Sequence, residues 1–443
     1  MPRDLPLAGA AIDVVRRLRD HGHEAFWVGG CVRDFLLGRT PGDIDVGTSA
    51  RPEVIERLFA RTVPVGRQFG VILVLHRGFS IEVATFRAET GYSDGRRPDR
   101  VEFVDARADA MRRDFTINGM FYDPIDGVLH DWVEGRRDLD SGIIRAIGVP
   151  GERFGEDRLR MLRAVRFATQ LGFAVEPRTW EAIQGTAATI RGISAERIRE
   201  ELLRLLRPPG AARGLRLLHD SGLLRVILPE VEVFRGCEQG AEYHPEGDVF
   251  EHVCLMLDQL PADSPALLPW AVLLHDVGKP PTAQHEPGTG RIRFFGHERI
   301  GADMAETILR RLRFPVRELE QVTTAVRHHM QFKDAPRMRK ATLRRMLLRP
   351  TFPLELELHR LDCLGSHGQL ETWNFVRAAA RELAAKPEVL PPLLTGHDLM
   401  TLGVAPGPEM GRLLAEVRDR QLGEELTAKE EALEWVRNCL RQA

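Results

Sequence analysis

Long hydrophobic runs, paired cysteines and a large net charge are all missing from this chain of 443 residues. No apolar stretch approaches the roughly 18–20 residues that cross a membrane. The first residues lack the apolar core of a signal peptide, so we expect a cytoplasmic protein without membrane association. The five cysteines are scattered, with no CxxC pair, which favours a reducing compartment and argues against a zinc ribbon. The net charge of −2 means that a nucleic-acid partner needs local basic patches.

The composition is that of an ordinary soluble globular protein, with 43% hydrophobic and 28% charged residues. The length allows two to four domains. Residues 10–20 have helical spacing, residues 25–28 form a short strand pattern, and residues 71–76 and 81–85 are β-rich runs joined by a turn at Arg77–Gly78. From Gly151 onward the pattern is helical. We therefore expect an α+β fold with a small head at 1–140, followed by helical parts at 141–210, 211–380 and 381–443, with a break at Pro208–Gly210.

Residues 29–45 combine a glycine pair, an arginine and two acids. On a strand, residues i and i+2 point to the same face about 6.5–7 Å apart. Asp43 and Asp45 can thus converge on two divalent cations, as in-line phosphoryl transfer requires, and Mg²⁺ suits hard oxygen ligands. Glu82, on a later β-rich run, is the candidate third carboxylate.

The glycines and the arginine supply the other half of a nucleotide site. Gly29 and Gly30 let the backbone approach a triphosphate closely, and Arg33 can neutralise its charge. An Asp-x-Asp pair by itself is common in acidic loops, and such a loop without a catalytic role is the alternative interpretation. The preceding glycines and arginine and the following Thr48–Ala50 favour the catalytic interpretation.

This segment resembles the active-site signature of class II tRNA nucleotidyltransferases and bacterial poly(A) polymerases, members of the polymerase-β-like superfamily. The resemblance continues through residues 112–119, 123–127, 156–163 and 166–168. It implies a polymerase-β-like catalytic head, a neck, a body and a tail, and addition of CCA to the acceptor end of tRNA from CTP and ATP with Mg²⁺. It also implies nucleotide contacts from Gly29, Gly30, Arg33, Arg112 and Arg113.

Four charged residues, Asp157, Arg160, Arg163 and Arg166, follow at steps of three and predict one polar stripe on a helix. A solvated face with internal ion pairs is the alternative. The family resemblance implies that the first members of the stripe read the incoming base. An aspartate accepts from the amino group of cytosine or adenine and an arginine donates to the ring nitrogen, whereas uracil and guanine present the opposite pattern.

A polar segment, Glu89–Pro98, predicts a mobile loop. In the family, such a loop is associated with the switch from C to A addition. Its presence argues against an enzyme that adds only CC.

Downstream, His252, His275, Asp276 and Asp362 match an HD-type phosphohydrolase pattern. His297 and the pair His328–His329 are candidates for binding a second metal or the substrate phosphate. Of the pair, we expect His328 to be the metal ligand. Imidazole with carboxylate suits Ni, Mn, Co or Fe as well as Mg. Single histidines are more often core or surface residues, but the ordered set favours a metal site that hydrolyses a phosphoester, such as a 2′,3′-cyclic phosphate at an RNA end.

The run Arg337–Arg349 contains six basic residues and no acid. On a helix it predicts a basic surface for RNA phosphates, with a plain solvated face as the alternative.

We therefore expect a template-independent tRNA nucleotidyltransferase that adds C, C and A. One alternative is an enzyme that adds only the terminal A beside a separate CC-adding enzyme, and another is a poly(A) polymerase. A signalling enzyme that pairs a nucleotidyl-type fold with an HD hydrolase is disfavoured because such enzymes place the HD part first. An HD hydrolase whose head only binds RNA ends is disfavoured because Asp43 and Asp45 are both retained.

Overall fold

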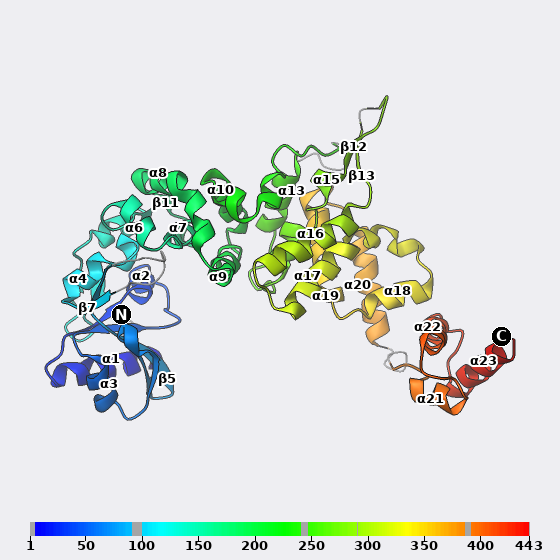
Figure 1. The fold of residues 1–443 in the computed structure, drawn as a ribbon, viewed down its shortest axis with the longest axis horizontal. Coiled ribbons are helices and arrows are strands. Elements are labelled where there is room, and N and C mark those ends of the chain that lie inside the picture. The colour runs from blue at the N-terminus through cyan, green and yellow to red at the C-terminus, as the bar shows by residue number, and fades with distance from the viewer. Residues whose placement is uncertain (1–4, 91–99, 241–246, 290, 386–390, 443) are drawn as a thin grey trace. The chain divides into compact units, whose positions relative to one another are not determined.

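The chain folds into two compact units, residues 1–232 and 233–443 (Figure 1). The computed structural model describes residues 5–90, 100–240, 247–289, 291–385 and 391–442. The predicted four-part division remains a prediction. The three helices after residue 210 lie in the first unit, and the predicted limit at 380 falls inside the helix Glu371–Ala384.

The first unit begins with a seven-stranded sheet in the order β3-β4-β5-β2-β1-β8-β9. Its inner strand β1 is four apolar residues, all buried, as a core strand requires. The strands are β1 (Ala25–Val28), β2 (Asp45–Thr48), β3 (Thr62–Gly66), β4 (Val71–His76), β5 (Phe79–Thr85), β8 (Phe121–Tyr122) and β9 (Leu129–His130). The predicted strands at 25–28 and 71–76 match β1 and β4, and the third begins two residues earlier than expected.

The predicted turn between β4 and β5 is a two-residue hairpin. Arg77 and Gly78 both have positive φ, 48° and 81°, which is the backbone of a type I′ turn. All pairings in this sheet are antiparallel except β2 with β5, whose register places Val46 beside Val83. This parallel pair positions the acidic residues described below.

Helices and a small second sheet complete the head. These elements are α1 (Pro6–Asp20), α2 (Gly30–Leu36), α3 (Pro52–Leu58), η1 (Arg67–Phe69), β6 (Arg87–Thr90), β7 (Arg100–Phe103), α4 (Ala106–Met111), η2 (Thr116–Asn118) and α5 (Gly135–Asp140). Phe26, Val28, Phe86 and Phe121 form one buried cluster of the core. The predicted loop, residues 89–98, begins inside strand β6, and its residues 91–98 are outside the described residues.

The rest of the first unit is almost entirely helical. Its elements are β10 (Ile143–Ile144), α6 (Pro150–Glu156), α7 (Arg160–Leu171), β11 (Ala174–Val175), α8 (Pro177–Thr186), η3 (Ala187–Gly192), α9 (Ala195–Leu205), α10 (Ala211–Asp220), α11 (Leu223–Ile227) and α12 (Pro229–Glu232). Helix α7 ends because Gly172 adopts φ 77°, a left-handed conformation that favours glycine. One face of α7 carries the arginines of the predicted stripe.

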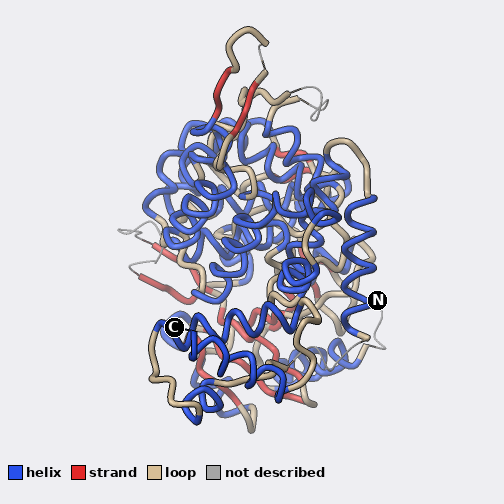
Figure 2. The backbone as a smooth tube through the Cα atoms, turned by 90° about the vertical axis from the view of Figure 1, so that its right-hand side faces the viewer, coloured by secondary structure: helices blue, strands red, loops and turns tan. Residues whose placement is uncertain are grey.

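In the described part of the second unit, all elements are helices except the β12–β13 hairpin. Figure 2 shows the helices in blue and the strands in red. Its elements are α13 (Val249–Asp258), α14 (Leu268–Leu274), α15 (Lys279–Thr282), β12 (Ala283–His285), β13 (Ile292–Phe294), α16 (His297–Arg311), α17 (Val316–His328), η4 (His329–Arg337), α18 (Lys340–Leu347), α19 (Phe352–Gly365), α20 (Glu371–Ala384), α21 (Gly396–Thr401), α22 (Pro408–Leu422) and α23 (Lys429–Gln442). Asp248 caps the N-terminus of helix α13, because its carboxylate accepts a hydrogen bond from the Glu251 amide at 2.9 Å. Among the described residues, no helix is long and apolar enough to cross a bilayer.

Candidate active site

The glycine turn of the head faces two guanidinium groups. Gly29 has φ 76°, a conformation that side chains rarely adopt. A Cβ atom added there would lie 3.1 Å from Nη1 of Arg113, and one added at Gly30 would lie 3.7 Å from Nη2 of Arg33. The turn therefore leaves space for a ligand beside two cations.

Three carboxylates lie beside this turn. The register of β2 with β5 places Asp45 and Glu82 on the same face of neighbouring strands. Burial raises the pKa of Asp45 to about 7, and the charges of Glu82 and Asp43 add to the shift while Arg113 opposes it. Glu82, Asp43 and Arg113 are thus close enough to Asp45 to change its pKa.

The carboxylate set fits a divalent cation of the Mg²⁺ class. Three hard oxygen donors of like charge repel one another, and a cation between them removes that cost. The carboxylate oxygens of these three side chains are farther apart than the potential metal-binding atoms of the histidine cluster described below. Among the described residues, the only groups whose potential metal-binding atoms lie within 4.8 Å of one another are in the second unit.

Arg112 and Arg113 are held in place by one buried acid. Their Nη2 atoms lie 2.7 Å and 3.0 Å from the two carboxylate oxygens of Asp109. Burial acts to raise the pKa of Asp109, but the two arginines lower it below its ordinary value. Arg113 also lies over the ring of Phe121, 5.0 Å from its centroid. Asp109 therefore orients both guanidinium groups without any ligand.

A hydrogen-bonded chain connects Arg33 to helix α7. Nη1 of Arg33 donates to Oδ1 of Asn118 at 2.8 Å, and Nδ2 of Asn118 donates to Asp114 at 3.1 Å. Asp114 in turn accepts two hydrogen bonds from Arg163, at 2.8 Å and 2.6 Å. The guanidinium groups of Arg33 and Arg163 both lie over the Phe167 ring, 5.0 Å and 5.3 Å from its centroid. The head and α7 are thereby joined beside the glycine turn.

The predicted stripe on one helix is wrong at its first member. Asp157 follows α6 in an extended conformation, φ −136°, and α7 begins only at Arg160. The Asp157 carboxylate accepts hydrogen bonds from the Leu159 amide at 3.1 Å and from Arg197 at 2.9 Å. Asp157 therefore lies at the start of the helix rather than on its face.

The three arginines of α7 have different surroundings. Arg160 pairs with Glu156 at 2.7 Å and donates to the carbonyl of Arg112 at 3.1 Å. Arg166 is buried and its Nε donates to Glu201 at 2.6 Å. Arg160 is thus next to Arg112, whereas Arg166 makes an internal ion pair.

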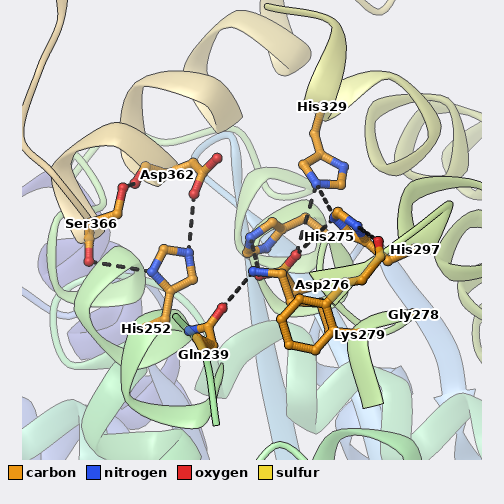
Figure 3. A network of polar contacts seen from close by, with 12 residues as sticks. Gln239, His252, His275, Asp276, Gly278, Lys279, His297, His329, Asp362 and Ser366 are labelled. Carbon is orange, nitrogen blue, oxygen red and sulfur yellow. Dashed lines mark hydrogen bonds and ion pairs between the residues drawn. The ribbon is translucent and has the colours of Figure 1, made fainter. Parts of the chain in front are cut away.

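Buried histidines and aspartates of the second unit converge around Asp276 (Figure 3). Two groups share this carboxylate, one with His252 and His275 and the other with His297 and His329. Asp362, from α19, lies 3.1 Å from Nε2 of His252. Elements far apart in the sequence, from α13 to α19, therefore supply one cluster.

The imidazole rings of this cluster are oriented for metal binding. The Nδ1 atoms of His275, His297 and His329 face backbone carbonyls at 2.8, 2.8 and 2.7 Å. Because a carbonyl only accepts, each Nδ1 carries the proton and each Nε2 presents a lone pair. The Nε2 atoms of His297 and His329 are 3.2 Å apart. Burial and the neighbouring histidines lower the pKa of His329 to about 3, so a proton does not relieve this repulsion at neutral pH.

The buried polar atoms of the cluster also suit a bound cation. The Nε2 of His275 is buried, makes no hydrogen bond and lies 3.1 Å from Oδ2 of Asp276. Lys279 places its Nζ 2.7 Å from Oδ2 of Asp276 and also donates to Gln239 at 2.6 Å. Nitrogen and carboxylate donors in this number suit a divalent transition metal or Mg²⁺.

The expectation that His328 is a metal ligand does not agree with the position of its side chain. His329 lies in the cluster, whereas His328 ends α17 and is half-buried outside it. Burial, with the charges of Arg349 and Arg327, lowers the pKa of His328 to about 4. Adjacent residues on a helical turn point about 100° apart, so only one of the two can reach Asp276.

The basic run at 337–349 does not form the broad free surface that was predicted. Lys340 and Arg344 pair with Glu424, and Arg345 pairs with Asp419. Helix α18 thus docks against α22 of the tail through these cations. Arg337 and Arg339 are exposed, as are the ion-paired Lys340 and Arg345.

Three family models match successive parts of the chain. Residues 25–145 match the poly(A) polymerase head domain, residues 172–234 match a probable RNA- and SrmB-binding site of polymerase A, and residues 248–362 match the HD domain. The head-domain match spans the glycine turn and the three carboxylates, and the HD-domain match spans the histidine cluster.

Curated relatives are CCA-adding enzymes. The chain is 43% identical over 238 residues to that of Lactobacillus johnsonii, a match covering 54% of this chain and 58% of the relative. It is 42% identical over 265 residues to that of Latilactobacillus sakei, covering 58% and 66%. The matches thus span less than two thirds of the relatives' own length.

A solved structure extends the similarity to the whole chain. The CCA-adding enzyme of Bacillus stearothermophilus in complex with CTP superposes with a TM-score of 0.76 at 27% identity, covering 99% of this chain and 98% of the other. The Thermotoga maritima enzyme complexed with tRNA has a TM-score of 0.56 at 19% identity and shares the fold.

Proposed function

We propose that this protein is a template-independent tRNA nucleotidyltransferase that adds C, C and A to tRNA 3′ ends from CTP and ATP. The observation that carries the proposal is the set Asp43, Asp45 and Glu82 beside the Gly29 turn and Arg113. The similarity of the whole chain to a CCA-adding enzyme that binds CTP supports the choice of nucleotide.

In this proposal the three carboxylates hold Mg²⁺, which when bound lowers the pKa of the attacking 3′-hydroxyl and neutralises charge on the phosphoryl group. The chain's own groups position the nucleotide. Gly29 and Gly30 leave room for the triphosphate, and Arg33, Arg112 and Arg113 neutralise it. Asp109 keeps Arg112 and Arg113 oriented, so these two side chains lose little further conformational freedom when the nucleotide binds.

Base selection falls to Asp157, Arg160 and Arg163. Asp157 accepts from the amino group of cytosine or adenine, and an arginine donates to the ring nitrogen. Both Asp157 and Arg163 are paired with protein groups, so they are held rigidly at the start of α7. Arg166 supports α7 through Glu201 and does not read the base.

We place the reaction in the cytoplasm, with the acceptor arm of tRNA as the partner. All five cysteines are free in the structure, which suits a reducing compartment.

The decisive experiment uses three tRNA transcripts that end at the discriminator base, at C and at CC, each incubated with single nucleotides and Mg²⁺. The proposal expects two C additions to the first transcript with CTP and one A addition to the third with ATP. An enzyme that adds only A extends the third transcript alone. A poly(A) polymerase adds many A residues to unrelated RNA.

A second function is favoured by the converging Nε2 atoms of the histidine cluster. We propose a metal-dependent phosphohydrolase at His252, His275, Asp276, His297, His329 and Asp362. The metal is Ni, Mn, Co, Fe or Mg. Metal analysis of the purified full chain, followed by phosphate-ester hydrolysis with each metal added back, tests this activity. Absence of hydrolysis with every metal contradicts it.

A further inference from the structure

A cavity of about 260 Å³ opens in the head beside the start of helix α1. Residues 5–8, strand β1, helix α2, the connection from α2 to β2 and the start of β5 all contribute to its walls. Protein interiors have few voids larger than a water molecule, and an apolar cavity of about 150 Å³ is large enough to hold benzene. The space in the head therefore accommodates a small organic molecule.

The cavity lies on the face of the large sheet that is turned away from the carboxylates. The strand register pairs Trp27 with Val46, and Val46 with Val83 on β5. Phe79 is four residues before Val83 on the same strand, so Trp27 and Phe79, which both line the cavity, share one face. Asp45 is adjacent to Val46 on β2 and therefore points to the other face.

The connection from α2 to β2 forms one wall of the cavity and carries Asp43. Thr40, Pro41 and Ile44 all line the cavity. Ile44, which lies between Asp43 and Asp45 in the sequence, is only 4% exposed. A molecule in the cavity thus contacts the segment that holds Asp43, from the side of the sheet opposite Asp45.

The walls are almost entirely apolar and rich in aromatic rings. Trp27, Phe35 and Phe79 supply three rings, and no described residue that lines the cavity is charged. Aromatic rings pack favourably against other rings beyond the area that they bury. A buried charge needs a charged or hydrogen-bonding partner, which these walls lack. The lining therefore suits a neutral aromatic ligand.

One polar group of the wall has no partner. Trp27 is 3% exposed, and its Nε1 is buried and makes no hydrogen bond with any described residue. An indole N–H can only donate, and nearly all buried donors in folded proteins have an acceptor. A ligand that carries an acceptor satisfies this donor, whereas a pure hydrocarbon leaves it unpaired. Apolar walls with one or a few polar groups that fix orientation are typical of small-ligand sites.

We propose that this cavity binds a neutral aromatic small molecule that carries one hydrogen-bond acceptor. The ring of the ligand packs against Trp27, Phe35 and Phe79, and its acceptor accepts the hydrogen bond from the Trp27 Nε1. The site is separate from the nucleotide site and from the histidine cluster, so its test does not depend on either proposed activity.

Matched probes test the chemistry of the ligand on the wild-type full chain. Acetophenone has a carbonyl acceptor, α-methylstyrene has the same shape with a methylene in place of the oxygen, and benzoate has a similar size with a negative charge. The six tryptophans of the ¹⁵N-labelled protein give separate indole signals that NMR follows during each titration. We expect acetophenone to shift the Trp27 signal saturably and to bind roughly threefold to tenfold tighter than α-methylstyrene, the size of one net hydrogen bond. Benzoate should leave the signal in place.

Trp27→Phe assigns the Trp27 signal and removes the donor while it keeps an aromatic wall. In ligand-detected NMR, its affinity for acetophenone should fall to that for α-methylstyrene, and its affinity for α-methylstyrene should stay at the wild-type value. Trp270→Phe is the matched control. Trp270 is 0% exposed and its Nε1 also makes no hydrogen bond, but it lies on α14 in the second unit. This control should bind both probes as wild type does.

A Trp27 signal that acetophenone does not shift saturably overturns the proposal. Equal affinities of wild type for acetophenone and α-methylstyrene contradict the acceptor, and a saturable shift of the Trp27 signal by benzoate contradicts the neutral class. These three comparisons need no substitution beyond the assignment of the signal, so they decide the matter even where Trp27→Phe is too unstable for binding measurements.

Discussion

Asp114 accepts two hydrogen bonds from the guanidinium group of Arg163 and thereby ties the head to helix α7. Both partners are largely shielded from water, with side-chain exposures of 10% and 31%. A third hydrogen bond, from Asn118, extends the contact to Arg33 beside the glycine turn. The position of α7 relative to the glycine turn therefore depends on one carboxylate.

Replacing this carboxylate should cost stability in a pH-dependent manner. Burial, the largest single cause, acts to raise the pKa of Asp114, but the charge of Arg163 and the hydrogen bonds from Asn118 and Arg163 together lower it to about 2. A depressed carboxyl pKa stabilises the fold fully above the unfolded value near 4 and loses this contribution as pH falls toward 2. We expect Asp114→Asn to lower the free energy of unfolding by about 2 kcal/mol at pH 7.

Denaturant unfolding of both proteins between pH 7 and pH 3 measures this effect. The difference between wild type and Asp114→Asn should shrink as the solution becomes more acidic. Asp140→Asn, which removes an exposed pair with Arg136, is the control and should change stability by less than about 0.5 kcal/mol. A constant difference across the pH range contradicts the assignment.

Base selection should depend on Asp157 and not on Arg166. Asp157→Ala removes the acceptor for the base amino group, so we expect the preference for CTP over UTP to fall at least tenfold, on the order of one lost hydrogen bond to a charged group. Arg166→Met breaks the buried pair with Glu201 and should lower the melting temperature while the preference is retained. Single-nucleotide incorporation kinetics measure both. Equal loss of selectivity in the two variants contradicts the roles.

Replacing His329 and replacing its neighbour His328 should have different effects on metal binding. His329→Gln removes a ligand beside Asp276, whereas His328→Gln changes a side chain outside the cluster. We expect the first variant to lose bound metal, measured by mass spectrometry of the purified protein, and the second to retain the wild-type amount. The reverse result would restore the sequence-based choice of His328.

The basic run should contribute to RNA binding through Arg337 and Arg339 rather than through its ion-paired members. Lys340 and Arg345 are neutralised by Glu424 and Asp419, so their replacement by Gln should leave the salt dependence of tRNA affinity unchanged. Replacing Arg337 and Arg339 by Gln should reduce the slope of log K against log salt by about one unit for each lost phosphate contact. Filter binding at several salt concentrations measures the slopes.

Several features of the head were predictable because they depend on local pattern. Strands β1 and β4 and the Arg77–Gly78 turn follow from apolar alternation and turn residues. Asp43 was expected one strand step from Asp45, but β2 begins only at Asp45, so the period of a strand does not place Asp43. Local pattern is strongest where one face of a strand is buried.

Other features depend on tertiary contacts that no spacing reveals. Asp157 was expected on the helix, but its side chain accepts the Leu159 amide and pairs with Arg197, which stabilises a break before α7. The choice between His328 and His329 depends on which ring faces Asp276. The basic run lost its predicted free surface because acids more than seventy positions away in sequence, Asp419 and Glu424, neutralise it.

The most direct test of the central claim is incorporation of radiolabelled CTP into a tRNA transcript that ends at the discriminator base. Wild-type protein with Mg²⁺ should add two cytidylates, and Asp43→Asn and Asp45→Asn should each lose at least a thousandfold in rate while their melting temperatures stay near wild type. Cytidylate addition that survives removal of either carboxylate would contradict the account.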